Sequence, residues 1–270
     1  MRIWPRLCAC ALGAGLFVGT TSAASAQFYV RSPDVEKGQT AIEEHGAIYS
    51  GPGEDERRRQ SHEVEFKHGL TDRWELIVEG FFRQDIGESI EAREFEIGAQ
   101  YEIIERHGDG IGLAFRTIYE FALQDHSPDE ILFGPLAKYV KGSDSATINT
   151  FFVGQVSDEA EIDSLELKVN WRLKHEFGEH FALGVEGYGE IEDLSHAGSF
   201  NDQQHSLGPT LFYMPGGDDD DNGNGNGDDD DERKVGGPPE MEISLNLGLQ
   251  FGLTDLTSDT ALKFQGALEF

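Results

Sequence analysis

The acidic run from Asp218 to Glu232 has the clearest metal-ligand spacing in the sequence, because it contains only Asp, Asn, Gly and Glu. Calcium loops place oxygen ligands at the first, third, fifth and twelfth positions, with glycine at the sixth for a sharp turn. Two overlapping registers match this spacing, with ligands at Asp218, Asp220, Asn222, Asn224, Asp229 and Asp231. The twelfth position is Asp instead of the usual Glu, and repetitive sequences match such patterns by chance. The run therefore predicts weak calcium binding at most, and a disordered, solvated insertion over residues 215–239 is the simpler interpretation.

Paired glutamates offer a second kind of chemistry. Glu75 with Glu79, and Glu94 with Glu96, could share proton transfer as acid and base. The alternative is that they line a water-filled interior and pair across it with basic side chains. No Gly-x-Ser-x-Gly, His-Glu-x-x-His or Gly-x-x-x-x-Gly-Lys motif occurs in the sequence. We therefore predict that the chain is not an enzyme, and a hydrolase with a site dispersed along the sequence is the alternative.

The elements that must position these groups are β-strands, because apolar and polar residues alternate along much of the chain. Successive side chains of a strand point to opposite faces, so alternation produces one apolar face and one polar face. The clearest example spans residues 165–177, in which Leu167, Val169 and Trp171 alternate with polar residues. The pattern predicts an all-β chain of about twelve strands, within a range of 10–14. The predicted strands are 39–49, 62–70, 74–83, 95–103, 111–123, 132–140, 147–156, 165–177, 181–191, 207–213, 241–251 and 260–270.

The last predicted strand ends on an aromatic residue. Leu262, Phe264, Leu268 and Phe270 share one face, and polar residues such as Lys263 lie on the other. Bacterial outer-membrane barrels commonly end in this way, and the ending resembles the signature by which the barrel-assembly machinery recognises them. We therefore expect this machinery to be a partner of the terminal strand.

The amino terminus has the features of a secretory signal peptide. Two arginines precede an apolar run over residues 7–18, and Ala24-Ser25-Ala26 then supplies a small-x-small cleavage site. We expect residues 1–26 to be removed, which leaves a mature chain that begins near Gln27. Both cysteines, Cys8 and Cys10, lie in the signal segment. The mature domain, residues 27–270, therefore has no disulfide and no thiolate site.

The charge of the chain limits its partners. The formal net charge of -30 excludes a surface that neutralises nucleic-acid phosphates. Such an acidic chain could be disordered, but its 18 phenylalanines occupy alternating positions that form regular apolar faces. We therefore expect one folded β-domain and no nucleic-acid partner.

Alternation fits a soluble barrel with an apolar interior as well as a membrane barrel with an apolar exterior. Three features favour a membrane barrel over a soluble one. The polar faces are densely ionic, many strands are long enough to cross a bilayer at a tilt, and aromatic residues lie near strand ends. A spanning sheet must also close, because an open edge in lipid leaves backbone amides unpaired. We therefore predict a transmembrane up-and-down antiparallel β-barrel.

This barrel assigns the two faces of each strand to lumen and lipid. The residues predicted to line the lumen are Glu75, Glu79, Glu94, Glu96, Arg116, Glu120, Glu166, Lys168, Arg172 and Glu186. The residues predicted to face lipid or form the aromatic girdles are Trp74, Phe82, Tyr101, Trp171, Phe181, Phe264 and Phe270. Outer-membrane lipid and lipopolysaccharide are the partners that such a surface implies.

Short polar turns recur at nearly equal intervals along the chain. They lie near Thr71, His107, Ser143 and Gly178, and the next interval ends near Met214. One pair of strands with a longer loop fills each interval, so the short turns and the C-terminus share one rim, which would face the periplasm. The same spacing places the acidic insertion on the periplasmic side. Long loops usually face outward, so the side of the insertion stays open.

A family resemblance supports this interpretation. The run Gly69-Leu70-Thr71-Asp72-Arg73-Trp74-Glu75-Leu76 resembles a strand-turn-strand motif of proteobacterial outer-membrane β-barrel proteins of the phenol-degradation-pathway (MetA-pathway) and transporter type. The segment from Gly252 to Phe264 resembles the final hairpin of the same group, and Gly208-Pro209 is also similar. The resemblance covers most of the mature chain through short motifs. It implies an outer-membrane barrel with a transport role, and it names no catalytic residue and no substrate.

These observations together predict a channel or transporter for small solutes in the outer membrane of a Gram-negative bacterium. A barrel without a pore that serves a structural or adhesive role is one alternative. A secreted soluble β-barrel that binds a ligand is another. No cofactor is expected apart from weak calcium at the acidic insertion. The solute, the oligomeric state and the presence of a plug in the lumen stay open.

Overall fold

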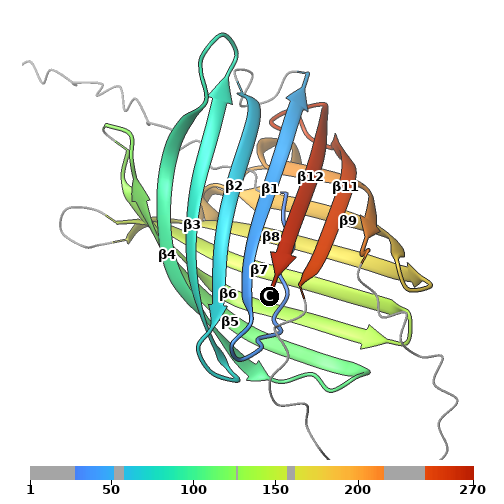
Figure 1. Ribbon diagram of the computed structural model, residues 1–270. Helices are drawn as coiled ribbons and strands as arrows, with labels where there is room; N and C mark the ends of the chain where they lie inside the picture. Colours follow the sequence, from blue (N-terminus) through green and yellow to red (C-terminus); the bar gives the residue numbers. More distant parts are fainter. Residues whose placement is uncertain (1–27, 52–57, 126, 157–161, 216–240) are drawn as a thin grey trace, which may run out of the picture.

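The computed structural model describes residues 28–51, 58–125, 127–156, 162–215 and 241–270. Within these residues the chain forms one closed barrel of twelve antiparallel strands (Figure 1). Two short 3-10 helices, η1 (Leu194–His196) and η2 (Phe200–Asp202), lie between the ninth and tenth strands. The strands are β1 (Thr40–Ser50), β2 (Arg58–Gly69), β3 (Trp74–Asp85), β4 (Glu91–Ile104), β5 (Gly110–Ala122), β6 (Asp129–Lys141), β7 (Asp144–Val156), β8 (Ile162–Phe177), β9 (Phe181–Ile191), β10 (Gln204–Tyr213), β11 (Glu242–Gly252) and β12 (Thr260–Glu269).

Each strand pairs with its neighbours in sequence, and the first strand pairs with the last. The β1–β12 ladder runs from Ala41, opposite Glu269, to Ser50, opposite Thr260. Closure leaves the described strands without an open edge of unpaired amides, which is the condition for a sheet in hydrocarbon. The predicted up-and-down antiparallel barrel is therefore confirmed.

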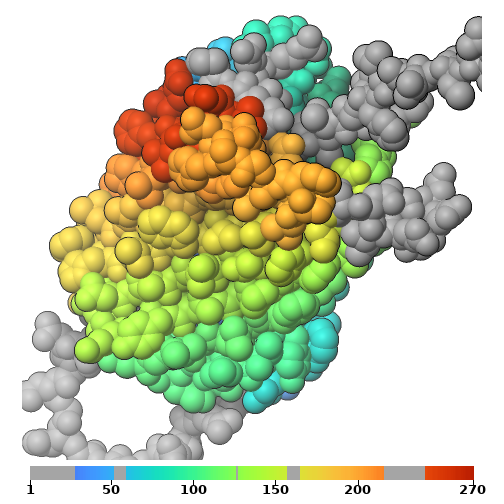
Figure 2. All heavy atoms as spheres, turned by 180° about the vertical axis from the view of Figure 1, so that it is seen from behind, coloured from blue at the N-terminus to red at the C-terminus, as the bar shows by residue number. Residues whose placement is uncertain are grey.

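The outer face of the barrel is apolar. Leu247 and Ile111 leave 52% and 58% of their surface exposed, which is unusual for large aliphatic side chains in a water-soluble domain. The inner face carries the ionic residues, so the face that meets the surroundings suits lipid. A soluble barrel with an apolar interior, the alternative that the sequence left open, is wrong. From behind, the outer wall is a continuous surface across the strands from green to orange (Figure 2).

The predicted lipid-facing aromatics lie on this outer surface. Trp74, Phe181 and Phe270 are exposed, while Phe82, Tyr101, Trp171 and Phe264 are partly covered by their neighbours.

Two of these rings cover glycines on the adjacent strand. The indole of Trp171 lies over Gly187, and the ring of Phe264 lies over Gly46, so closely that a side chain at either glycine would collide with the ring. A glycine next to an aromatic residue lets the ring lie flat on the sheet.

The two rims differ in their connections. β2–β3, β4–β5, β6–β7 and β8–β9 are joined by short turns at the rim where β12 ends, as the spacing of the turns predicted. Gly142 and Gly178 adopt φ angles of 57° and 72° in two of these turns, which favours glycine over other residues. β10 ends and β11 begins at the same rim. The predicted signal peptide and the predicted calcium ligands lie outside the described residues.

Several strands are longer than the alternation predicted. β2 begins at Arg58, β4 at Glu91 and β8 at Ile162, where charged residues interrupt the apolar pattern. Backbone pairing to a neighbouring strand needs no apolar side chain, so the ladders continue past the segment that faces lipid. A register shift between Phe81 and Phe82 marks a bulge near one such end. No helix among the described residues is long and apolar enough to span a membrane.

Candidate functional site

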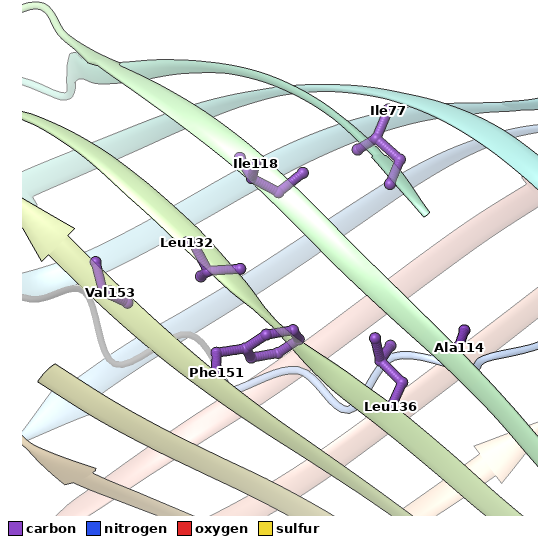
Figure 3. Close-up of a cluster of buried hydrophobic side chains, with 7 residues drawn as sticks. All are labelled: Ile77, Ala114, Ile118, Leu132, Leu136, Phe151 and Val153. Carbon is purple, nitrogen blue, oxygen red and sulfur yellow. The ribbon is translucent and has the colours of Figure 1, made fainter. Parts of the chain in front are cut away.

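The segment of residues 28–39, which we call the strap, lies inside the barrel. Tyr29, Val30 and Arg31 of the strap are almost completely buried. The strap precedes β1, whose first residue Thr40 pairs with His68 at the rim of the C-terminus. Figure 3 shows the strap as a pale blue trace that crosses the interior. The barrel is therefore filled by its own chain.

Arg31 is the central charged group of the strap. Its guanidinium donates to the Glu63 carboxylate at 2.7 Å and to the Glu79 carboxylate at 3.3 Å, and it lies 3.6 Å from a carboxylate oxygen of Glu65. Arg116 on β5 donates to the same Glu65 and Glu79. All five side chains are buried, so two guanidiniums compensate three carboxylates away from bulk water. We call these three glutamates and Arg116 the ionic sector.

Side-chain amides of the wall hold the backbone of the strap. The Asn149 side chain accepts from the Arg31 N–H at 2.7 Å and donates to the Arg31 carbonyl at 2.9 Å. Asn170 donates to the Tyr29 carbonyl at 3.1 Å, and Gln100 donates to the Ser32 carbonyl at 3.1 Å. An extended segment inside a barrel has no strand partner, so the wall must satisfy its backbone groups. These amides replace a β-ladder.

Tyr29 anchors the strap to β1. Its hydroxyl donates to the Glu43 carboxylate at 2.7 Å, and its ring stacks on His45 with 3.7 Å between ring centroids. His45 also lies 3.3 Å from Glu43, and Lys67 pairs with the same carboxylate. The aromatic ring and the hydroxyl of Tyr29 therefore both find partners on β1.

The strap leaves the interior through a polar vestibule. Asp34 accepts from Lys138 at 2.5 Å and from Arg106 at 3.2 Å. The vestibule has a volume of 570 Å³ and opens at the rim where β1 begins and β12 ends. A second, narrower cavity of 40 Å³ lies beside Phe28 and Arg31. Strap residues therefore line both a wide space and a narrow one.

A second buried ion cluster lies on another part of the wall. Glu186 accepts from Arg172 at 2.6 Å, from the Thr210 hydroxyl at 2.7 Å and from the Tyr188 hydroxyl at 3.0 Å. Lys263 on β12 donates to the same carboxylate. These partners all belong to the wall, so the role of Glu186 is to join β8, β9, β10 and β12.

An apolar patch completes the inner wall. Its side chains come from β3, β5, β6 and β7 and lie together in the interior (Figure 3). We call it the apolar sector; it consists of Ile77, Ala114, Ile118, Leu132, Leu136, Phe151 and Val153. Phe151 and Leu132 line the narrow cavity together with Arg31, so the strap and both sectors border this cavity.

All residues predicted to line the lumen lie on the inner wall, but they are far less exposed to solvent than expected. Glu79, Glu96, Arg116, Glu120, Glu166 and Glu186 are buried, and Glu75, Glu94, Lys168 and Arg172 are half-buried. Some of their ion pairs also run along the wall instead of across the lumen. Lys168 lies 3.1 Å from Glu166 on its own strand, and Arg172 pairs with Glu186 on the next strand. The strap occupies the centre, which leaves the wall to pair with itself.

Several residues of the site were absent from the set predicted to line the lumen, although Lys263 was placed on the polar face of its strand. Asn149, Asn170 and Lys263 occupy inner-face positions, which the alternation of their strands could have indicated. Gln100 follows Glu96 on the inner face of β4, so the same alternation could have placed it there. The strap has no periodicity, so no pattern in the sequence marks it.

One group of metal-binding side chains lies beside the strap in the part of the chain that the structure describes. His45, Glu63 and Glu65 each place a ligand atom within 4.8 Å of the others. Imidazole and carboxylate ligands at this separation suit a transition-metal ion. Arg31 and Arg116 already compensate both carboxylates, however, so the group is satisfied by protein cations.

No protein-family model matches the chain, and no curated protein matches its sequence. Among solved structures, the KdgM porin in complex with disordered oligogalacturonate is 9% identical, with a TM-score of 0.49 over 85% of this chain and 98% of the porin. The NanC porin is 10% identical, with a TM-score of 0.48 over 85% of this chain and 98% of the porin. A bacterial polysaccharide outer membrane secretin is 8% identical, with a TM-score of 0.43 over 88% and 99% of the two chains. These similarities concern the fold.

Proposed function

We propose that the chain is an outer-membrane channel that lets small solutes cross the bilayer. The observation that carries the proposal is the distribution of polarity, with an apolar outer face and an inner wall of glutamates, arginines and lysines. A closed wall of this kind separates an aqueous path from lipid. The 570 Å³ vestibule offers solutes an entrance at the rim of the C-terminus.

The vestibule favours cations. Its acidic side chains are Asp34, Glu36, Glu75, Glu102, Glu105 and Glu269, and its basic ones are Lys67, Arg106 and Lys138. The chain as a whole carries a formal net charge of -30. A cleft lined by an excess of one sign concentrates ions of the opposite sign. We expect cations to enter more readily than anions of the same size.

The strap provides the control point of the proposed channel. It fills the middle of the lumen, so solutes pass only when it moves toward one rim. A barrel without a pore, in which the strap is a permanent filling, is the second candidate function. The burial of Tyr29, Val30 and Arg31 is the observation that favours it.

Planar-bilayer recordings separate the two functions. The full chain and an Asn149→Ala, Asn170→Ala variant would be reconstituted, because the variant loses three hydrogen bonds to the strap backbone. A channel with a displaceable strap gives rare openings in the wild type and frequent, cation-selective openings in the variant. Thr147→Ala, at a buried inner-wall position of β7, is the matched control and should behave as the wild type. Silence from both proteins, with heat-modifiable migration intact, would contradict the channel.

Delivery to the outer membrane would use both ends of the chain. Cleavage after Ala26 would make Gln27 the first residue of the mature chain, and the strap, residues 28–39, would follow it directly. The barrel-assembly machinery would recognise Phe270. Lipid and lipopolysaccharide would contact the outer face of the barrel. Amino-terminal sequencing of outer-membrane fractions tests the cleavage, and Phe270→Ala should lower the amount of assembled barrel. Equal assembly of the variant would remove Phe270 from the recognition signal.

A further inference from the structure

We propose that the ionic sector is a binding site for solutes that carry a guanidinium group, and that Arg31 of the strap is its resident occupant. The biological role of this site rests on the proposed passage of solutes through the barrel. The ability of the site to bind a guanidinium is independent of that passage. The wall holds the strap as it would hold a peptide ligand, through its backbone and through one charged side chain.

The charge balance of the site requires a cation at the position of Arg31. Glu63 is 2% exposed, and Arg31 is its only ion-pair partner among the described residues. Glu65 and Glu79 keep Arg116 when the strap leaves, but Glu63 keeps no cation. Three carboxylates then face one guanidinium, and this excess of negative charge attracts a cation. Release of Arg31 therefore creates a demand for another cation at the same place.

The buried carboxylates also have unused hydrogen-bonding capacity. Among the described residues no donor forms a hydrogen bond to the Oε2 atom of Glu63, which is almost fully buried. The Oε1 atom of Glu65 also lacks a hydrogen bond, and its nearest cation, the Lys67 ammonium, lies 3.6 Å away. A guanidinium has five N–H donors in a planar fork that matches two carboxylates at once. Arg31 is held in place by the strap backbone. A guanidinium on a free solute could move to donate hydrogen bonds to the oxygens that Arg31 leaves without one.

The wall further defines the shape of the ligand. Asn149 offers one acceptor and one donor, which match the N–H and C=O of a single residue. Tyr29 lies with its ring 4.7 Å from the Arg31 guanidinium, but this ring belongs to the strap and leaves with it. The wall alone therefore recognises a guanidinium at arginine's distance from a peptide-like amide. Nα-acetyl-L-arginine amide has this shape, and the uncharged Nα-acetyl-L-citrulline amide is its closest neutral match.

The binding experiment uses the full-length barrel in detergent micelles and isothermal titration with these two compounds. Arg31→Ala should bind the arginine compound at least ~10-fold more tightly than the wild type, because the occupied site lowers the apparent affinity. Arg31→Ala with Glu63→Gln should lose this gain. Arg31→Ala with Glu88→Gln, a charge change in an exposed loop, should keep it. The citrulline compound should bind none of them.

Three results would overturn the site. Equal binding by the wild type and Arg31→Ala would remove Arg31 as the occupant. Equal binding of the citrulline compound would remove the charge requirement. Zinc or calcium chloride that binds Arg31→Ala while the arginine compound does not would assign the cluster of His45, Glu63 and Glu65 to a metal instead.

A second measurement keeps the proposal falsifiable if Arg31→Ala does not fold. In the wild type, the arginine compound should compete with Arg31 and release the strap, so chymotrypsin should cleave after the buried Tyr29 faster as its concentration rises. The citrulline compound should leave the rate unchanged. An unchanged rate with both compounds would overturn the proposal. Binding in micelles without conductance would remove the channel and leave this site, and conductance without binding would do the reverse.

Discussion

The ionic sector and the apolar sector occupy the same inner wall, yet they are stabilised in different ways. Glu63, Glu65 and Glu79 are buried carboxylates, and each depends on a guanidinium from β5 or from the strap. Leu136 and Phe151 of the apolar sector need only to be covered. The first sector therefore depends on particular partners, and the second depends on packing density.

This difference shows that the inner wall obeys other rules than the outer wall. Lipid imposes the same requirement around the whole barrel, so the outer face is largely apolar, with the Glu44–His62 pair on β1 and β2 as a polar exception. A lumen filled by a strap accepts any side chain that finds a partner there. Charged and apolar patches can then lie side by side, and Arg31 of the strap pairs with the first and borders a cavity that the second helps to line.

The largest effect is expected where a charge of the ionic sector loses its partner. Arg116→Ala leaves Glu65 and Glu79 without their guanidinium from the wall, in an interior without bulk water. The expected loss is about 3–5 kcal/mol of unfolding free energy. Urea titration in lipid vesicles, followed by loss of the heat-modifiable band, measures it.

A double variant shows whether the loss has this cause. Arg116→Ala combined with Glu79→Gln removes one of the orphaned charges and should recover part of the stability. A loss below about 1 kcal/mol for Arg116→Ala alone would show that water screens the sector. The contrast between the two sectors would then disappear.

A smaller loss is expected in the apolar sector. Leu136→Ala removes a fully buried side chain, and the expected cost is about 2–3 kcal/mol, because the strap can move to fill part of the cavity. Leu136→Met keeps the volume and should cost less than about 1.5 kcal/mol. The same urea titration compares both variants. A loss for Leu136→Ala that exceeds that of Arg116→Ala would reverse the order of the two sectors.

The sequence predicted the barrel well and the contents of its lumen poorly, and the two sectors explain why. Lipid makes one face of each strand largely apolar, so alternation revealed the strands and their outer residues, such as Trp171 and Phe264. Inside, β6 and β7 carry apolar residues on both faces, for example Leu132 with Phe133, because the apolar sector lies opposite the lipid face. Their alternation is therefore weak.

The strap illustrates the limit more sharply. Its residues are held by single side chains from β4, β7 and β8, which lie far from it in the sequence. No local sequence pattern encodes such contacts, so the ion pair between Arg31 and Glu63 could not be predicted from the sequence. The glutamates could be assigned to the lumen by alternation, but their burial depends on a segment that sequence periodicity does not detect.

A more local effect is expected where the strap backbone is clamped. Asn149→Ala removes one acceptor and one donor from the backbone of Arg31. Each hydrogen bond contributes about 1 kcal/mol, so the amide of Arg31 should exchange with solvent roughly 10-fold faster or more. Hydrogen exchange followed by mass spectrometry of the strap measures this rate. Thr147→Ala, at a neighbouring inner position, should leave the rate unchanged; equal acceleration by both variants would mean that the clamp is not specific.

The smallest effect on stability is expected for Asp193, a carboxylate outside both sectors. It tests how much hydrogen bonds stabilise a carboxylate that is not buried. Asp193 is solvent-exposed and accepts hydrogen bonds from the Ser195 hydroxyl, from His196 and from the Ser195 N–H, which lower its pKa from 3.8 to about 2. Because the pKa is lowered on folding, this turn is stabilised above about pH 4, and the stabilisation is lost as the pH falls through about 2. Ser195→Ala should raise the pKa of Asp193 toward its ordinary value, as seen in a carboxyl NMR titration, and lower the urea midpoint at neutral pH only slightly, because solvent screens this exposed group. A drop as large as that of Arg116→Ala would mean that a surface hydrogen bond affects the barrel as strongly as the buried ionic sector does.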